Sequence, residues 1–376
     1  MIYLDNAATS FHKPPAVINA VNYALKNYSA NPGRSGHNAS LAASVAVFNT
    51  REKLSRMFGC EGAENVVFTA NNTYALNCII KGVLHRGDHV ITSDLEHNAV
   101  MRPLDKLHRE GFITYSTAVT DINDDITLQN FKKLIKPETR LVVCTHASNV
   151  LGAVLPVEKI GRMCKEQGIL FVVDAAQSAG VLDIDMQKMN IDFLCVAPHK
   201  GLYAPMGTGV LIARKPIKNT IVEGGTGTAS LSLVQPEIMP EQFESGTLNV
   251  PGICGISAGV DFVAKKTPLR IYKHEFSLLD RLYNILSQNK KIIFYWGKPV
   301  LGKTVPVLSF NVAGMRSEQT AEFLNSKNIA VRAGYHCAPS AHKKVGSLDS
   351  GTVRVSFGAF NTKNDVDYLV NSLKFL

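Results

Sequence analysis

Lys200 is the residue of this sequence best placed for covalent chemistry. It follows an apolar run and a histidine in FLCVAPHKGLYAPMGTG, ahead of a glycine-rich stretch. A lysine in apolar surroundings loses solvation of its charged form, so its pKa falls. A neutral amine of this kind can form a Schiff base with a carbonyl compound. The segment therefore indicates a lysine that binds a ligand covalently, and a plain surface lysine after a strand is the alternative.

Two further segments place polar side chains where apolar runs end. Asp174 ends the run ILFVVD, and Gln177 follows in the same segment. An unpaired carboxylate at a buried strand end is costly, and a ligand cation is a reasonable partner at the carboxyl end of a parallel strand. Asn72 and Thr73 stand between the run NVVFTA and a helical pattern, where free N–H groups bind phosphate. Ordinary helix capping is the alternative in both places.

A cysteine and two arginines lie near the end of the chain. Cys337 stands beside His336 in VRAGYHCAPSA, with Arg332 nearby. A loop thiol close to cationic groups holds more of its thiolate form, which is the nucleophile. Arg354 stands in the strand-like run TVRVSF, where its planar fork can hold a carboxylate with two hydrogen bonds. For the cysteine alone, a buried apolar role is the alternative.

The segment GKPVLGKT, residues 297–304, fits the phosphate-loop pattern GxxxxGK[ST]. Such a loop needs a strand before it and a helix that opens at its Lys-Thr pair. The run KIIFYW can supply the strand, but the strand-like run VPVLSFNV follows, with Pro306 close after Thr304. The context favours a surface turn, and nucleotide hydrolysis at this segment stays a remote alternative.

Composition narrows the class of protein. The chain has 376 residues, a net charge of +9 and 45% apolar residues, which is enough for a large core. Its lysines and arginines are scattered and form no long run, so we expect no nucleic-acid surface. No stretch is long and apolar enough for a membrane span, and the start MIYLDNAATS lacks signal-peptide features, so we expect a cytoplasmic protein. The 7 cysteines are scattered with no CxxC pair, so neither a disulfide framework nor a metal site is expected.

The elements that must position these residues form an α/β pattern. Short continuous runs of Val, Ile, Leu and Phe alternate with helical patterns, which is typical of a mainly parallel sheet with both faces covered. The strand-like runs are NVVFTA, HVITS, FITYST, LVVCTH, ILFVVDAA, DFLCVA and GVLIAR. One helical pattern begins at Pro14, since proline is well placed in a first turn. Another begins at Ser40, which we expect to cap that helix. Residues 14–265 therefore form the predicted large domain, and residues 1–13 and 266–376 a smaller α+β domain.

In this order the segments resemble the pyridoxal-phosphate enzymes of the class V aminotransferase group, with fold type I. Within the group, the likeness is greatest to second-group cysteine desulfurases and selenocysteine lyases. It covers the whole chain and rests on the strings YLDNAAT, RSGH, SDLEHNA, HASNVLGAVLPV, VVDAAQSAG, PHKGLYAPMGTG, FESGTLN, VRAGYHCAP and VRVSFGAFNT. The resemblance implies pyridoxal 5'-phosphate as the cofactor and a homodimer as the assembly.

The resemblance also implies cofactor-binding roles. Lys200 would hold the cofactor covalently, and Asp174 would pair with its pyridine nitrogen. Gln177 would bond the phenolic oxygen, and His97 would stack on the ring and take part in proton transfer. The phosphate would be bound by the remaining members of the set, which are Asn72, Thr73, His199 and, across the dimer interface, Thr247.

The substrate roles follow in the same way. Asn149, Arg354 and His37 would hold L-cysteine, and the reaction would yield L-alanine while Cys337 takes the sulfur as a persulfide. The short segment between Cys337 and Arg354 resembles the second group and suggests a dedicated sulfur-acceptor protein. Ala197 departs from relatives with Ser or Thr there, which removes one phosphate hydrogen bond. A selenocysteine lyase or related β-lyase acting on L-selenocysteine, and a cofactor-binding protein without turnover, stay open.

Overall fold

A computed structural model describes residues 1–33 and 35–376 of the chain, and its largest element is a sheet of seven strands. The strands run in the order β2 (Val66–Thr69), β8 (Gly209–Ala213), β7 (Phe193–Val196), β6 (Leu170–Asp174), β5 (Thr139–Thr145), β3 (His89–Ser93) and β4 (Thr114–Ala118). From β7 to β4 all neighbours are parallel, whereas β8 is antiparallel to both of its neighbours. The predicted α/β class with a mainly parallel sheet is confirmed.

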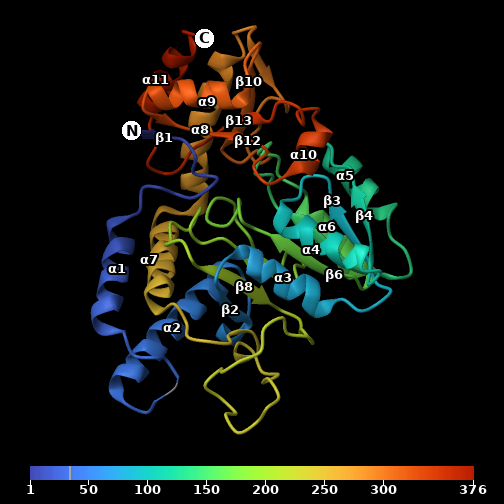
Figure 1. The fold of residues 1–376 in the computed structure, drawn as a ribbon, viewed down its shortest axis with the longest axis vertical. Helices are drawn as coiled ribbons and strands as arrows, with labels where there is room; N and C mark the ends of the chain where they lie inside the picture. Colours follow the sequence, from blue (N-terminus) through green and yellow to red (C-terminus); the bar gives the residue numbers. More distant parts are fainter. Residues whose placement is uncertain (34) are drawn as a thin grey trace.

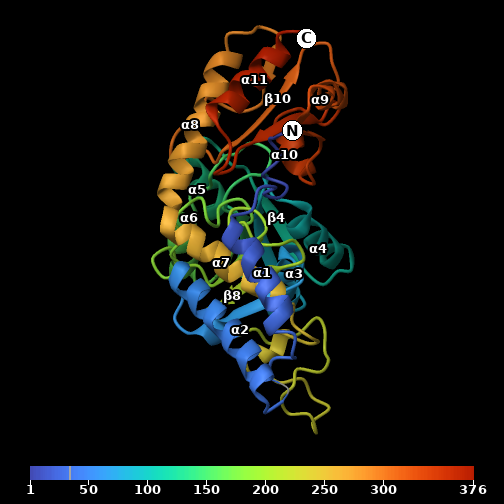
Figure 2. The same ribbon diagram turned by 90° about the vertical axis from the view of Figure 1, so that its left-hand side faces the viewer.

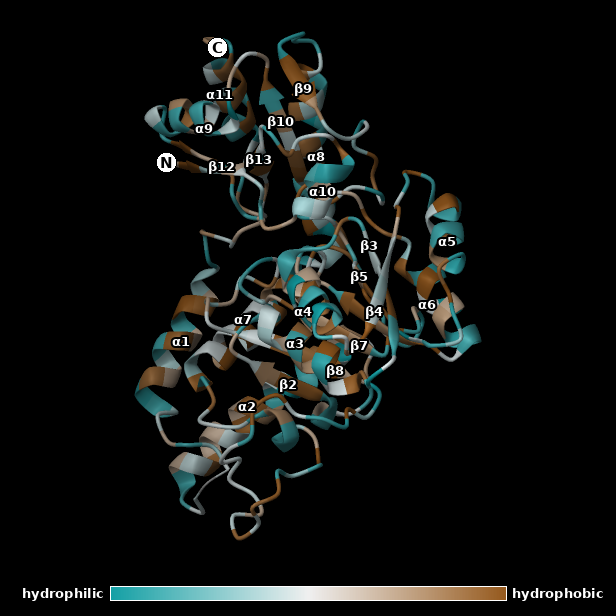
Figure 3. Ribbon diagram, turned by 45° about the vertical axis from the view of Figure 1, so that its right-hand side comes forward, coloured by the Kyte–Doolittle hydropathy of each residue, from teal (hydrophilic) through white to brown (hydrophobic). Residues whose placement is uncertain are grey.

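Apart from the edge strand β4, which is partly exposed, the strands of this sheet are mostly buried on both faces, as their continuous apolar runs predict. On one face, Val142, Phe171 and Leu194 pack with α2 (Asn38–Met57), α6 (Val157–Gln167) and α7 (Val250–Lys266). On the other face, Val143 and Val172 pack with α3 (Asn72–Val83) and α4 (Asn98–Arg109). In Figure 3, helices around the sheet, such as α1 and α4, are banded with hydrophobic (brown) and hydrophilic (teal) residues.

A second sheet lies at the other end of the molecule (Figure 1). Its antiparallel order is β12 (Arg332–Gly334), β13 (Thr352–Ser356), β10 (Val307–Val312) and β9 (Ile292–Phe294). It packs on α8 (Pro268–Leu286), α9 (Ser317–Ser326) and α11 (Lys363–Leu373) around a separate apolar cluster. The N-terminal β1 (Ile2–Tyr3) pairs in parallel with β11 (Ile329–Ala330), so the first residues lie beside this second sheet.

The two sheets are joined by consecutive helices. α7 ends at Lys266 and α8 begins at Pro268, and Thr267 between them has a φ of 67°. Figure 2 shows α8 along the edge of the molecule, continuing from α7 toward the second sheet. The predicted boundary between residues 265 and 266 lies inside the last turn of α7, one residue before its end. The division into domains 14–265 and 1–13 with 266–376 itself stays a prediction.

One local expectation differs from the structure. α2 begins before Ser40, because the Nδ1 atom of His37 accepts a hydrogen bond from the Ser40 N–H (3.2 Å). The Ser40 hydroxyl instead donates to the Asn31 carbonyl oxygen (2.7 Å). The predicted Ser40 cap is therefore wrong, and His37 caps the helix.

Some elements left no clear pattern in the sequence, namely α5 (Asp124–Lys132), α7 and α10 (Pro339–Lys344). The α7 helix begins with a proline at its first turn and contains several glycines, which lower helix propensity. Gly259 explains this composition, since a Cβ atom there would lie 2.0 Å from the Leu202 carbonyl oxygen. The glycine lets α7 approach the turn that contains Lys200, so packing overrides propensity here. The remaining helix α1 (Pro15–Asn27) agrees with the predicted start at Pro14 within one residue.

The segment GKPVLGKT forms a turn between two strands. β9 ends before it at Phe294 and β10 begins after it at Val307, and Thr304 makes an isolated bridge with Ala153. No helix opens at Lys303 or Thr304. Without that helix the N–H groups that cradle phosphate are missing, so the nucleotide-hydrolase alternative is wrong. Among the described residues, no helix could cross a membrane and no metal-binding cluster of acidic, histidine and cysteine side chains occurs.

Candidate active site

One cavity of about 230 Å³ brings together most of the residues expected to do chemistry. It lies where β6 and β7 end and where the N-termini of α3 and α4 meet β13 of the second sheet. The expected residues that line it are Asn72, Thr73, His97, Asn149, Asp174, Gln177, His199, Lys200 and Arg354. These side chains come from both sheets, so the cavity is formed by their junction.

Lys200 stands in the tight turn after β7. Its N–H donates to the Ala197 carbonyl oxygen (3.1 Å), and its own carbonyl oxygen accepts from the Tyr203 N–H (3.0 Å). The loss of water around the amine lowers its pKa to about 8, with Arg354 and Arg332 acting in the same direction and Asp174 opposing them. The lowered pKa makes the neutral, nucleophilic amine more abundant near neutral pH than it is for an ordinary lysine.

Asp174 ends β6 with its side chain almost completely buried. Its Oδ1 atom accepts hydrogen bonds from Asn72 Nδ2 (2.8 Å) and from the Ala176 N–H (3.0 Å). Both described bonds end on Oδ1, which leaves Oδ2 for a ligand in the cavity. The Oδ1 atom of Asn72, at the first turn of α3, is buried without a hydrogen-bond partner in the described chain. A polar ligand would satisfy it.

Two histidines line the same cavity in neutral form. His97 caps α4, and its Nδ1 atom accepts from the Ala99 N–H (3.0 Å), so Nε2 carries the proton of the neutral ring. Burial is the main reason that the pKa of His97 is lowered. His199 Nδ1 lies 3.0 Å from Thr9 Oγ1, and burial, followed by Lys200 and Lys13, lowers the pKa of His199 to about 4.

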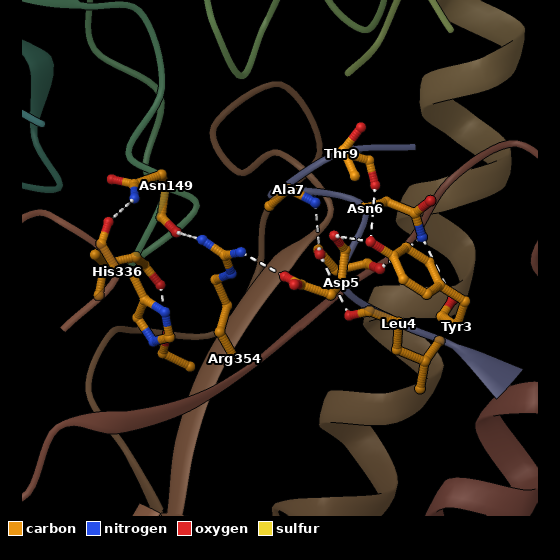
Figure 4. Close-up of polar contacts among 12 residues, drawn as sticks. Tyr3, Leu4, Asp5, Asn6, Ala7, Thr9, Asn149, His336 and Arg354 are labelled. Carbon is orange, nitrogen blue, oxygen red and sulfur yellow. Dashed lines mark hydrogen bonds and ion pairs between the residues drawn. The ribbon is translucent and has the colours of Figure 1, made fainter. Parts of the chain in front are cut away.

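Arg354 faces the cavity from β13 and is 1% exposed. Its Nη2 donates to Asp5 Oδ1 (2.6 Å), and its Nη1 donates to the Asn149 carbonyl oxygen (3.1 Å), as Figure 4 shows. Burial lowers its pKa, and Asp5 opposes this shift. The Nε atom is buried with no partner among the described residues. A fixed guanidinium with a free donor suits a small carboxylate.

Cys337 directly follows His336, which lines this cavity, in a loop with unusual backbone geometry. His336 and Cys337 have φ angles of 50° and 58°, in the left-handed region that non-glycine residues rarely adopt. Asn149 Nδ2 donates to the His336 carbonyl oxygen (2.7 Å), and the Asn98 N–H donates to the Cys337 carbonyl oxygen (2.7 Å). Cys337 is exposed, whereas the other cysteines are buried. The loop therefore presents one accessible thiol beside the cavity.

Besides Cys337, two expected site residues are not among those that line the cavity of this chain. Thr247 is exposed in the loop before α7, and His37 is exposed at the start of α2. Their roles stay predictions. Arg34, in the string RSGH, lies outside the described residues.

The sequence placed Arg332 near Cys337 only and gave Asp5 no role, yet both residues belong to the site. Arg332 lines the cavity and lowers the pKa of Lys200. Asp5 pairs with Arg354, from which it is separated by 349 positions. The aspartate stands in the quoted string YLDNAAT, and the pairing of β1 with β11 together with an isolated bridge between Asp5 and Ser356 of β13 brings it here.

Comparisons with known proteins agree with this geometry. The family described as "Aminotransferase class-V" matches residues 2–369. The chain is 33% identical to a probable cysteine desulfurase of Pyrococcus abyssi, covering 100% of this chain and 94% of the relative. It is 30% identical to a cysteine desulfurase of Haloferax volcanii, covering 99% of this chain and 88% of the relative.

Solved structures show the same likeness. The fold matches a cysteine desulfurase from Thermococcus onnurineus with a TM-score of 0.92 and 33% identity, covering 100% of this chain and 94% of that one. A cysteine desulfurase from Escherichia coli matches with a TM-score of 0.87 and 27% identity, covering 99% of this chain and 94% of that one.

Proposed function

This chain belongs to the class-V aminotransferase family, and we propose that it is a pyridoxal-phosphate-dependent cysteine desulfurase. It would convert L-cysteine to L-alanine and keep the sulfur on Cys337 as a persulfide. The observation that carries the proposal is the single cavity lined by Lys200, Asp174 and His97, with an exposed Cys337 at its rim. The relatives described as cysteine desulfurases support it along the full chain.

The residues of the cavity suit pyridoxal phosphate. Lys200 offers an amine with a lowered pKa to the aldehyde, and Asp174 offers a buried carboxylate to the ring nitrogen. In this proposal the N–H groups of the first turn of α3, which begins at Asn72, bind the phosphate. In this proposal Thr73 and His199 also bind the phosphate, Gln177 binds the phenolic oxygen, and Thr247 reaches the phosphate from a second subunit.

The bound cofactor would supply an electron-withdrawing ring that lets a captured amino acid lose its α-proton. The protein must then move protons and keep charges in place. Lys200 Nζ can take a proton and return it, because its pKa of about 8 lies near working pH. His97 carries a proton on Nε2 when neutral, so it can donate from that atom into the cavity. Asp174, fixed by Asn72 and the Ala176 N–H, holds negative charge at the wall.

Arg354 and Asn149 would bind the substrate on the opposite wall. The free Nε donor of Arg354 would pair with the carboxylate of L-cysteine. The sulfur step would transfer one atom: the C–S bond of the substrate breaks, an S–S bond forms at Cys337 Sγ, and the carbon left behind takes a proton. The step needs no oxidant, since L-cysteine and a thiol give L-alanine and a persulfide.

We also propose that the protein acts as a homodimer. The outer side of α2 exposes Leu41, Val45 and Phe48 at helical spacing, and the loop before α7 exposes Leu231 and Leu233. Exposed apolar groups of this extent on neighbouring elements mark an interface. A second copy on this face would also give Thr247 a cavity to reach. Light scattering measures the molar mass of the purified protein in solution. A homodimer would give twice the mass of one chain, and a monomer the mass of one chain.

The exposure and the redox state of the cysteines bear on the sulfur-acceptor protein and on the cellular location. Cys337 is exposed on a short loop, so we propose that a sulfur-acceptor protein docks at the loop to collect the persulfide. All cysteines are free thiols, which suits a cytoplasmic location.

The proposed function is tested by the variant Cys337→Ser. Because a hydroxyl is a poor nucleophile toward sulfur, alanine release from L-cysteine should fall by about a hundredfold or more. The visible absorbance of the bound cofactor should stay at the parental level, since the loop lies at the rim. The matched control is Cys254→Ser, which changes a cysteine that is only 9% exposed and far from the loop in sequence.

Substrate choice separates the alternatives in the same assay. A selenocysteine lyase would lose little activity toward L-selenocysteine when Cys337 is replaced, because selenium leaves without an attacking thiolate. Equal losses on both substrates favour the desulfurase. Parental alanine release from L-cysteine by Cys337→Ser would contradict the proposal, as would a parent protein that captures no cofactor.

A further inference from the structure

The segment from Cys337 to Lys344 is attached at both of its ends to the segment from Asp94 to Asn98. At the first end, the Asn98 N–H donates to the Cys337 carbonyl oxygen (2.7 Å). At the second end, Lys344 Nζ donates to Asp94 Oδ2 (2.8 Å). The Asp94–Asn98 segment also contains His97. Two attachments thus fix the thiol-bearing loop relative to the histidine of the active site.

Asp94 is a rigid anchor. It directly follows β3, and its N–H donates to the Ala118 carbonyl oxygen at the end of β4 (3.1 Å). Its Oδ1 atom accepts from the Thr120 N–H (3.1 Å) and the Thr120 hydroxyl (2.6 Å), so Oδ2 is free for the lysine. The carboxylate is therefore fixed by the edge of the large sheet before the lysine binds it.

Lys344 is held by several groups at once. Besides Asp94, its Nζ donates to the Thr120 carbonyl oxygen (2.5 Å) and lies 5.9 Å from the centre of the Trp296 ring. The side chains of Lys344 and Asp94 are each 14% exposed, unlike most of the surface ion pairs of this chain. An ion pair sheltered in this way is screened less by water and salt than an exposed one.

The helix α10 carries this attachment to Cys337. It spans Pro339–Lys344, and its residues Ala341 and the preceding Ala338 are completely buried against the core of the large sheet. His336 and Cys337, just before it, keep left-handed φ angles that cost backbone energy. Such a conformation persists only where surrounding contacts hold it. The attachments at both ends of the segment are contacts of this kind.

We propose that the Asp94–Lys344 ion pair is a positioning device for sulfur transfer, which keeps the Cys337 thiol in register with His97 and the bound substrate. The inference rests on the proposed role of Cys337 as sulfur acceptor. Neither Asp94 nor Lys344 lines the cavity, so both act through the loop and not on the substrate. Small displacements of a reacting group slow a reaction strongly, so the pair affects kcat more than substrate binding.

The test uses the purified holoenzyme of Lys344→Met, which keeps much of the side-chain volume and removes the charge. We expect kcat for alanine release to fall about tenfold, with the KM for L-cysteine within twofold of the parent. The rate of Cys337 alkylation by iodoacetamide should change as well, because Cys337 is the one exposed thiol among the described cysteines. Asp94→Asn should behave in the same way, and the double variant should lose no more than the worse single variant.

A second ion pair supplies the matched control. Lys303 pairs with Asp124, and it also joins a loop beside the second sheet to a helix of the large sheet, but it does not touch the Cys337 segment. Lys303→Met should keep the parental kcat and alkylation rate. Trp296, the only tryptophan, lies beside Lys344, so its fluorescence reports whether α10 has moved. The conservative variant Lys344→Arg should restore most of the lost kcat.

Three outcomes would overturn the inference. The first is parental kcat and alkylation rate in Lys344→Met. The second is an equal loss of kcat in Lys303→Met at an equal fall in Tm, which would make the effect one of general stability. The third is a rise in KM with unchanged kcat. Failure of the proposed function is distinguishable, because then the parent itself would release no alanine or Cys337→Ser would remain fully active.

Discussion

The two walls of the cavity are built in different ways. On the wall from the large sheet, Asp174 ends a buried strand and Lys200 stands in the turn after the next one. On the wall from the second sheet, Arg354 is fixed by Asp5, while His336 and Cys337 depend on a strained loop and its attachments. The first wall is positioned by a sheet core, and the second by single contacts. We therefore expect cofactor binding and sulfur handling to be separable by mutation.

Lys200 belongs to the wall from the large sheet, and its replacement should reduce activity more than any other change considered. Lys200→Ala removes the amine that captures the cofactor and moves the proton, so alanine release should fall by at least about a thousandfold. Borohydride reduction of the parent should fix the cofactor on the peptide that contains Lys200, which mass spectrometry of a digest would detect. An adduct on another lysine, such as Lys13, would contradict the assignment.

Replacing Arg354 breaks the second wall and should have a smaller effect. Arg354→Lys keeps the charge but loses the planar fork, so the KM for L-cysteine should rise about tenfold, which corresponds to about 1.4 kcal/mol. Cofactor absorbance should be unchanged, because Arg354 faces the cavity from the other sheet. A drop in cofactor occupancy with an unchanged KM would show that the two walls are not separable.

The smallest expected effect concerns a contact between the two walls. Glu275 of α8 is fully buried, and its Oε1 accepts from the hydroxyl of Tyr203 (3.3 Å), in the turn that follows Lys200. Burial raises the pKa of Glu275 from 4.5 to about 8. The folded protein therefore holds the Glu275 proton more tightly than the unfolded chain does. This proton binding stabilises the folded state fully below pH 4.5, and its contribution to the free energy of unfolding is lost as the pH rises through about 8.

Glu275→Gln removes that titration. The Tm of the parent minus that of the variant should therefore be larger at about pH 5 than at about pH 9, by at least about 2 °C. Glu96, whose pKa is also raised to about 8 by burial, is present in both proteins and cancels in the difference. Thermal unfolding across this pH range provides the measurement, and a constant Tm difference would mean that Glu275 is ionised in the folded protein throughout.

The difference between the walls also explains what the sequence could predict. Apart from β4, the strands β2 to β8 have mostly apolar runs, and residues such as Asp174 and Lys200 stand at predictable strand ends. Local pattern is enough there, because the carboxyl ends of parallel strands meet at one edge. The family resemblance then assigned roles that local pattern left open, such as those of His97 and Gln177.

The features of the fold and the site that the sequence did not predict depend on contacts between distant segments. Asp5 reaches Arg354 through the pairing of β1 with β11 and its own bridge to Ser356 of β13. The helix α7 forms despite its glycines because it packs closely on the Lys200 turn. The attachment of Lys344 to Asp94 spans 250 positions. None of these contacts leaves a local period in the sequence. Thr247 and His37 lie outside the cavity of one chain, so their roles depend on a second copy.

Mass spectrometry of Cys337 after turnover tests the central claim most directly. The purified holoenzyme would be mixed with L-cysteine in the absence of any acceptor, alkylated under non-reducing conditions and digested. We expect the Cys337 peptide to gain the mass of one sulfur atom, in step with the alanine released in the first turnover, and a reductant should remove it. Alanine released in equal amount while the Cys337 peptide keeps its original mass would contradict the account.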